Sequence, residues 1–223
     1  MEKMDSRGTA PCRVLLFRHG QTVMNVENRF RGLLDVPLSA TGRAEAWTAA
    51  RSLTTAGVTA IYSSPLGRAL EVAEAIAATT RLRRVRKLDL LVNLDYGRWE
   101  GLTRGACAIA DPEDWYVYAN DPELAACPDG ESLATAGDRI VDALTEIGRA
   151  HPGETVAAVS HGVMLRLAVL RVAGRSSDDW QFAMPTGSAL TFEIQDGRIA
   201  LASSLDRTVS KRDPVPRLLG KTA

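Results

Sequence analysis

Short apolar runs alternate with longer amphipathic stretches along most of this chain, and no other feature constrains its fold as strongly. The run from Arg13 to Phe17 is nearly continuous and predicts a buried strand, as does the run from Thr155 to Ser160. A shorter strand is predicted from Ala60 to Ser63. Strands that alternate with helices usually pair in parallel, because each helix carries the chain back across the sheet.

Four amphipathic segments are predicted to be helices, because apolar residues recur in them at helical spacing. They run from Ser39 to Ala56, Leu66 to Thr80, Ser132 to Ala150 and Val163 to Val172. Ser39 or Thr41 is suited to cap the first of them, and Gly57 is suited to end it.

The C-terminal third adds a hairpin, and the middle of the chain adds an insertion. Asp196-Gly197 separates two short apolar runs, which predicts a tight turn between paired strands. Residues 101–130 contain three prolines and no strong period, which predicts a small inserted cap. The sequence therefore predicts one α/β domain over residues 1–223, with three layers, a mainly parallel sheet and helices on both faces.

Length and charge limit the classes of function. The 223 residues suit one domain, and the tail at 207–223 is predicted to be a poorly packed extension. Lys plus Arg and Asp plus Glu are both 27, so the basic excess typical of nucleic-acid or membrane-surface binding is absent. No run of about 18 apolar residues occurs, so no membrane span is expected. Any anion must be bound by a local cluster of cations.

Cysteine usage suggests the compartment. Cys12, Cys107 and Cys127 are odd in number and do not have metal-ligand spacing, so neither a disulfide framework nor a zinc site is predicted. Residues 1–11 are polar and predict no signal peptide. We expect a cytoplasmic protein with reduced thiols. Whether two copies associate as a homodimer stays open.

Two histidines directly follow the two buried strands. His19 lies beside Arg18, and Gly20 and Gly162 follow His19 and His161. A single histidine of this kind is more often structural. Ligands of open α/β sheets bind at the carboxyl ends of the strands, however, so two histidines at equivalent ends, one beside an arginine, favour a ligand site.

Arg68 adds a second cation at the same sheet edge. It falls in the first turn of a predicted helix, where the helix dipole disfavours positive charge. It is either an ordinary surface arginine or a side chain directed at a bound anion, and the second interpretation explains its position better. Imidazole beside the forks of Arg18 and Arg68, with no metal motif, predicts phosphoryl transfer through a histidine nucleophile.

An ordered set of motifs extends this pattern over most of the chain. They are Arg18-His19-Gly20-Gln21-Thr22, Asn25, Asn28-Arg29-Phe30, Gly32, Asp35-Val36-Pro37-Leu38-Ser39, Thr41-Gly42, Ser63-Ser64-Pro65-Leu66-Gly67-Arg68-Ala69, Tyr96-Gly97-Arg98-Trp99-Glu100-Gly101, Asp129-Gly130-Glu131-Ser132 and Ser160-His161-Gly162. From about Arg13 to Leu205 the chain thereby resembles the histidine phosphatase superfamily, also called the phosphoglycerate mutase-like family.

This resemblance implies roles for individual residues. His19 is the implied nucleophile that becomes a phosphohistidine, and Arg18, Arg68 and His161 are implied to bind the transferred phosphoryl oxygens. Asn25 is implied to support that pocket. The reaction of the family needs neither a metal nor an organic cofactor.

Further positions in the motifs are expected to contact the substrate. Gln21, Thr22 and Gly162 belong to this group. Arg31 departs from the family, which commonly has Gln or Thr at that position. It either adds a cation at the rim of the pocket or faces solvent, and both interpretations remain open.

Asn93 is a second departure. Relatives usually carry Glu or Asp at this position, where the carboxyl group protonates the leaving group and then activates water. An amide does neither. Asp95, two residues further along, is a candidate replacement, although the family motif often has an acid there as well. An introduced Asp-to-Asn substitution or a natural loss of turnover would equally account for the asparagine.

The charge composition of the predicted cap indicates how many phosphate groups the substrate carries. Residues 105–131 contain no Lys or Arg and seven acidic residues, whereas mutases of the family hold a bisphosphate with a basic cap. This favours a monophosphate phosphatase. The aromatic residues Trp115, Tyr116 and Tyr118 either line a pocket or form the core of the cap.

The sequence thus predicts a phosphomonoester hydrolase that acts on a small phosphorylated metabolite through a phosphohistidine. Three alternatives remain: a mutase-like phosphotransferase, a non-catalytic binder of phosphorylated ligands, and a relative diverted to another reaction. Substrate identity and pathway lie beyond the sequence.

Overall fold

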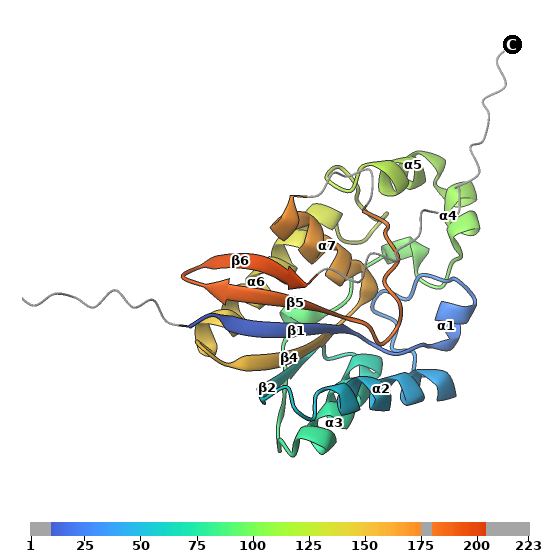
Figure 1. Cartoon of the computed structure of the whole chain (residues 1–223). Coiled ribbons are helices and arrows are strands. Elements are labelled where there is room, and N and C mark those ends of the chain that lie inside the picture. Colours follow the sequence, from blue (N-terminus) through green and yellow to red (C-terminus); the bar gives the residue numbers. More distant parts are fainter. Residues whose placement is uncertain (1–9, 175–179, 204–223) are drawn as a thin grey trace, which may run out of the picture.

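A six-stranded sheet forms the middle of the molecule (Figure 1), with strand order β3-β2-β4-β1-β5-β6. The computed structural model describes residues 10–174 and 180–203. The predicted tail at 207–223 therefore lies outside the described residues. The strands are β1 (Cys12–Arg18), β2 (Val58–Ser63), β3 (Val85–Lys87), β4 (Thr155–Ser160), β5 (Ala189–Gln195) and β6 (Arg198–Ser203).

The helices connect these strands in the predicted alternation. They are α1 (Val23–Val26), α2 (Ala40–Ser52), α3 (Gly67–Thr80), α4 (Arg104–Ala110), α5 (Pro112–Asn120), α6 (Leu133–Ala150) and α7 (Gly162–Ala173). Short 3-10 turns lie at Asp89–Leu91 and Gly97–Trp99.

Strand direction confirms the predicted fold class. β1 pairs in parallel with β4, β4 with β2, and β2 with β3. β5 and β6 add an antiparallel edge, joined by the predicted turn at Asp196-Gly197. Both turn residues have positive φ, as such a hairpin requires.

Helices cover both faces of the sheet and so create two apolar cores. In Figure 1, α2 and α3 lie below the sheet, and α6 and α7 lie on its other side. The predicted apolar stripe of α6 is fully buried, at Ala136, Ile140, Ala143, Leu144 and Ile147. Burial of this stripe fixes α6 against the sheet.

Several elements differ from the predictions. α2 begins after its cap, Ser39, whose hydroxyl accepts a hydrogen bond from Gly42, but it ends at Ser52, before the expected Ala56. β3 was not predicted, because three residues are too few to show a period. The predicted cap segment contains two helices, α4 and α5, above the carboxyl ends of the strands (Figure 1).

The aromatic residues of the cap act mainly as its core. Trp115 stacks on Tyr118 with ring centroids 5.7 Å apart, and both pack against Phe30. Tyr116 is 70% exposed on the outside. Only Tyr118 of the three also reaches the cavity described below.

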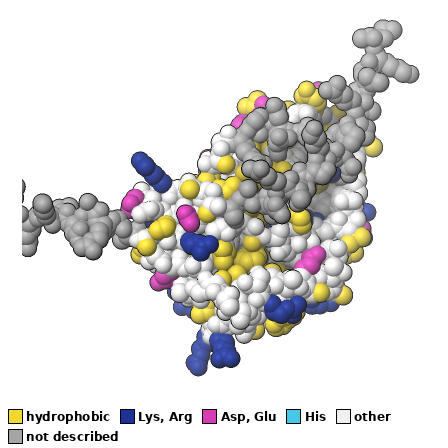
Figure 2. Space-filling model, viewed as in Figure 1, with side chains coloured by type: hydrophobic (Ala, Val, Ile, Leu, Met, Phe, Trp, Pro, Cys, Tyr) yellow, Lys and Arg dark blue, Asp and Glu magenta, His cyan; other side chains and the backbone are white. Residues whose placement is uncertain are grey.

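Charges of both signs are scattered over the face shown in Figure 2, in keeping with a net charge of zero. Among the described residues, no helix combines the length and the apolar character needed to cross a membrane.

Two glycines bring α2 against the loop that follows β1. A Cβ atom on Gly20 would lie 2.3 Å from the carbonyl oxygen of Gly42, and one on Gly42 would lie 2.0 Å from that of Gln21. Both distances are far below a van der Waals contact. Because Gly20 follows His19, this backbone contact fixes the loop that carries the candidate nucleophile.

We predict that Gly42→Ala lowers the free energy of unfolding by about 1–3 kcal/mol, because the added methyl group forces two backbone segments apart. Urea unfolding followed by circular dichroism measures the change. Gly105→Ala is the matched control, since nothing lies within 4 Å of its added Cβ and it lies in α4. Equal stability of the two variants would contradict the predicted role of this contact.

Candidate active site

The two sheet-edge histidines lie side by side because their strands are paired. Arg18, the last residue of β1, lies opposite Ser160, the last residue of β4. The backbone N–H of His19 donates to the carbonyl oxygen of Ser160 at 3.0 Å. The imidazole rings of His19 and His161 therefore lie with centroids 5.2 Å apart.

The surroundings of His19 select one tautomer. Nδ1 lies 2.6 Å from the carbonyl oxygen of Gly20, which only accepts, so Nδ1 carries the proton. Nε2 therefore holds a lone pair, and it has no hydrogen-bond partner among the described residues although it is buried. A buried, unprotonated and unpaired ring nitrogen is suited to act as a nucleophile.

His161 is held from the neighbouring strand. Its Nε2 lies 2.8 Å from Oγ of Ser64, which follows β2, while its Nδ1 has no partner in the described part of the chain. Both imidazoles are almost completely buried. A phosphoryl group therefore reaches them only after a neighbouring side chain moves.

Arg68 and Arg18 add two guanidinium groups that are anchored to backbone carbonyls. Arg68 is fully buried and donates to Leu34 at 2.6 Å and to Gly32 at 2.8 Å. Arg18 donates to the carbonyl oxygen of Met184. The Nε atoms of both arginines are buried without a partner in the described structure, so each keeps a donor for a ligand.

The clustering of cations and burial lowers the pKa values at this site. Burial, and then the charges of Arg68 and Arg18, hold the pKa of His19 well below its usual 6.5. Burial, and then Arg68, act in the same direction on the pKa of His161. Burial and repulsion from Arg31 lower the pKa of Arg18 to about 9 and that of Arg68 to about 10. A bound anion would relieve this repulsion.

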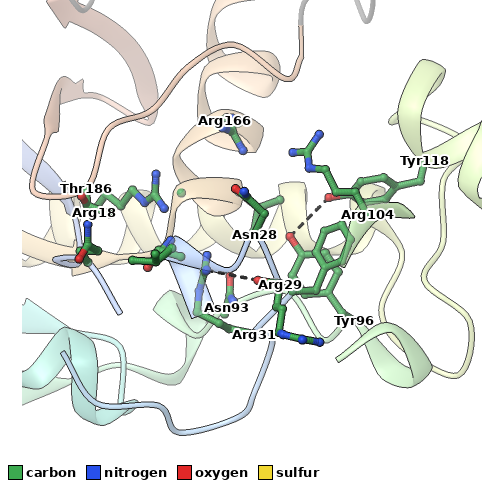
Figure 3. A pocket seen from close by; sticks show the side chains of 16 residues that line it. Arg18, Asn28, Arg29, Arg31, Asn93, Tyr96, Arg104, Tyr118, Arg166 and Thr186 are labelled. Atoms are coloured by element: carbon green, nitrogen blue, oxygen red, sulfur yellow. Dashed lines mark hydrogen bonds between the residues drawn. The ribbon is translucent and has the colours of Figure 1, made fainter. Parts of the chain in front are cut away.

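A cavity of about 380 Å³ opens beside this cluster (Figure 3). It lies between the ends of the strands, α7 and the cap. Of the sequence-predicted site residues, it is lined by Arg18, Gln21, Asn25, Arg31, Asn93 and Gly162. His19, His161 and Arg68 lie in the buried layer next to it, and Thr22 and Asp95 do not line it.

Thr22 and Asn25 are hydrogen-bonded to each other, but only Asn25 of the two lines the cavity. The Oδ1 atom of Asn25 accepts hydrogen bonds from the backbone N–H and the hydroxyl of Thr22, both at 2.9 Å. Thr22 is buried, whereas Asn25 reaches the cavity. Gln21 is fixed by a hydrogen bond from Ser39 to its Oε1 at 2.9 Å.

Asn93 and Asp95 have different surroundings. The side-chain amide of Asn93 donates to the carbonyl oxygen of Gly32 at 3.1 Å, and its Oδ1 is buried without a partner among the described residues. Arg68 donates to the same carbonyl oxygen, so the side chains of Asn93 and Arg68 converge on Gly32. The carboxylate of Asp95 instead accepts from the N–H of Gly97 at 2.8 Å and stabilises that turn.

Two arginines that the sequence reasoning missed also line the cavity, Arg104 from α4 and Arg166 from α7. Arg104 is the first residue of its helix, the same unfavourable place for a cation that singled out Arg68. Arg166 follows Gly162 by four residues and so shares its helix face. Both signals were present in the sequence.

The charge count over residues 105–131 does not describe the cavity. No carboxylate of the described residues lines it, and several acidic side chains of residues 105–131 pair with arginines outside it. Asp111 pairs with Arg98, Glu123 with Arg171 and Glu131 with Arg139, as shown by their ion pairs. The lack of Lys and Arg in residues 105–131 therefore does not leave the cavity without cations, since Arg104 and Arg166 line it.

Comparison with known proteins gives a consistent result. The family model of the histidine phosphatase superfamily (branch 1) matches residues 14–207. Phosphoserine phosphatase 1 of Hydrogenobacter thermophilus is 32% identical over 187 residues, which cover 83% of this chain and 88% of the relative.

Solved structures superpose on this chain over most of its length. The Bacillus stearothermophilus protein YhfR superposes with a TM-score of 0.79 at 32% identity, covering 86% of this chain and 95% of that one. A mycobacterial glucosyl-3-phosphoglycerate phosphatase, Rv2419c, solved with VO3, superposes with a TM-score of 0.73 at 28% identity. The match covers 84% of this chain and 98% of that one.

We predict that the free energy of unfolding falls as the pH drops below about 6.5. The unfolded chain then binds protons at His19 and His161, whereas the folded protein, with lowered pKa values, does not. The slope approaches about 1.4 kcal/mol per pH unit for each imidazole. Urea unfolding between about pH 5.5 and 7.5 measures it. His19→Gln should remove about half of the slope, and an unchanged slope would contradict the lowered pKa of His19.

Proposed function

The chain belongs to the histidine phosphatase superfamily, and we infer that it is a phosphoric monoester hydrolase acting on a small phosphorylated metabolite. The observation that carries this inference is the free lone pair on Nε2 of His19, held beside the buried Arg68, the partly buried Arg18 and a second imidazole. The mutase-like and non-catalytic alternatives are not favoured, because relatives named as phosphatases match over most of the chain.

We propose that the reaction proceeds in two displacements at phosphorus. Nε2 of His19 attacks, an N–P bond forms, and the P–O bond to the leaving group breaks, so that the leaving oxygen departs with the electron pair. Water then attacks the phosphohistidine, a P–O bond forms, the N–P bond breaks, and hydrogen phosphate leaves. The proton lost by the water passes to solvent, which also supplies the proton that neutralises the departed leaving oxygen. Nε2 regains its lone pair, while Nδ1 keeps its proton through the hydrogen bond to Gly20.

Arg18, Arg68 and His161 are proposed to hold the phosphoryl oxygens during both steps. Each guanidinium has a buried Nε–H without a partner in the described residues, and the fork geometry matches phosphate oxygens. Fixed positive charge stabilises the developing charge of the transition state without reorganisation. This role supplies the electrostatic stabilisation that other phosphatases obtain from metal ions, so we propose that the reaction needs no metal.

The cysteines support a cytoplasmic setting as part of the proposal. Cys12, Cys107 and Cys127 are free thiols, and all three are buried. Burial raises the pKa of Cys12 and of Cys107 to about 11, so these thiols stay protonated and unreactive. Unpaired structural thiols are typical of a reducing compartment.

We predict that His19 becomes phosphorylated during turnover. Incubation with a ³²P-labelled aryl phosphate in buffer with EDTA, followed by an alkaline quench, should leave acid-labile label on the protein. His19→Ala should abolish the label. His151→Ala is the matched control, since His151 pairs with Glu154 and Tyr62 far from the cavity. Label that persists in His19→Ala would refute the assignment.

We predict that alkyl phosphates are hydrolysed much more slowly than aryl phosphates. Asn93 cannot protonate a leaving oxygen, and the carboxylate of Asp95 is bound to the Gly97 turn. An alkoxide needs that proton, whereas an aryl oxide needs it far less. Asn93→Asp should therefore raise kcat/KM for alkyl phosphates by about 10²-fold or more and change aryl phosphates little.

The leaving-group dependence of kcat/KM measures this effect in the unsubstituted protein and in Asn93→Asp. Asp95→Asn separates the two positions. Fast alkyl hydrolysis that Asn93→Asp does not improve and Asp95→Asn abolishes would show that Asp95 is the acid.

A further inference from the structure

The cavity holds more positive charge than a phosphoryl group requires. Arg18 and Arg68 match the two negative charges of a phosphomonoester, yet Arg31, Arg104 and Arg166 also lie at or around the cavity. We propose that these three arginines form a subsite for a second anionic group, a carboxylate or a phosphate, on the leaving group of the substrate. This inference rests on the proposed function.

The position of these arginines in the cavity supports a role in binding the leaving group rather than the phosphoryl group. The phosphoryl group must contact His19 in the buried layer, so the rest of the substrate occupies the open space next to it. In Figure 3, Arg166 points from α7 toward this space and Arg104 approaches from the side of the cap. Arg31 is close to both groups of arginines, since its charge lowers the pKa of Arg18 and of Arg68 and the charge of Arg166 lowers the pKa of Arg31 itself.

Arg166 is anchored in a way that leaves its outer end open. Its Nε donates to the carbonyl oxygen of Phe182 at 2.7 Å. Its two terminal nitrogens make no hydrogen bond to the described residues. A guanidinium held at Nε presents these two nitrogens in the fork geometry that carboxylate and phosphate oxygens accept.

Arg104 is anchored by the same stretch of chain. Its Nη1 donates to Oε1 of Gln181 at 2.7 Å. The side-chain amide of Gln181 donates in turn to the carbonyl oxygen of Ala119 in the cap. The positive charge of Arg104 is electrostatically unfavourable at the start of α4. An anion in the cavity offsets that cost, as it does for Arg68.

None of the three has a carboxylate partner within residues 10–174 and 180–203, and Nε of Arg31 is buried with no partner at all in those residues. Arg29, which also lines the cavity, is different because it pairs with Glu27 at 2.7 Å. Burial, with a smaller contribution from the charge of Arg166, lowers the pKa of Arg31, and burial, with a smaller contribution from the charge of Arg104, lowers that of Arg166. Groups held this way bind an anion more strongly than isolated surface arginines do, because little reorganisation is needed.

The test compares matched aryl phosphates, whose leaving groups depend far less on a general acid than alkoxides do. The probes are 3- and 4-carboxyphenyl phosphate, the corresponding carboxamides as neutral partners, and 1,4-phenylene bisphosphate for the phosphate alternative. The variants are Arg104→Gln and Arg166→Gln. Arg98→Gln is the control for net charge, since Arg98 is 57% exposed and pairs with Asp111 outside the cavity.

We expect kcat/KM for a carboxylate or the bisphosphate to exceed that of the carboxamides by about 10-fold or more. Arg104→Gln and Arg166→Gln should each lower it by about 10- to 100-fold and lower the carboxamide value by less than about 3-fold. Arg98→Gln should change neither. A larger effect on the bisphosphate than on the carboxylates would identify phosphate as the second group, and the reverse would identify carboxylate.

Two results would overturn the subsite. One is an unsubstituted enzyme that hydrolyses the carboxamides as fast as both kinds of anionic probe. The other is an equal loss for neutral and anionic probes in Arg104→Gln and Arg166→Gln, which indicates a structural role. Failure of the proposed function looks different, because then no aryl phosphate is hydrolysed and no label appears on His19.

Discussion

The parallel pairing of β1 with β4 is the constraint on which the rest of the site depends. It places Arg18 opposite Ser160 and so brings His19 next to His161, although the two histidines are far apart in the chain. The helices on both faces bury most of these two central strands, and the cavity opens beside their carboxyl ends. The backbone contact between Gly20 and Gly42 then fixes the loop that carries His19.

Electrostatics at this edge differ from those on the rest of the molecule. Elsewhere, arginines such as Arg139 and Arg171 pair with nearby carboxylates. At the cavity, Arg29 pairs with Glu27, but Arg18, Arg31, Arg104 and Arg166 form no ion pair with a carboxylate of the described residues, and the folded protein keeps this arrangement at a cost in stability. Such uncompensated charge is typical of sites built for an anion, because the ligand supplies the missing negative charge.

The shared carbonyl oxygen of Gly32 connects anion binding with proton transfer. Arg68 and Asn93 both donate to it, so position 93 lies next to the arginine that we propose binds the phosphoryl group. A carboxyl group there would donate to Gly32 only when protonated, which is the form a general acid needs. An asparagine satisfies the carbonyl oxygen but has no proton to give, and the leaving group must then depart as an anion. Arginines on the leaving-group side suit that requirement.

The sequence by itself determined the alternation of strands and helices, the mainly parallel sheet and the strand-end histidines, because hydrophobic period and strand ends are local features. The buried stripe of α6 and the turn at Asp196-Gly197 follow from the same local rules. Tertiary structure alone decided which charges face the cavity. The acidic residues of the cap turn toward arginines elsewhere, Asp95 binds its own turn, and Arg104 and Arg166 are held by the stretch at Gln181 and Phe182. The direction of a charged side chain depends on partners that lie far away in the sequence, and no count of charges along a segment contains that information.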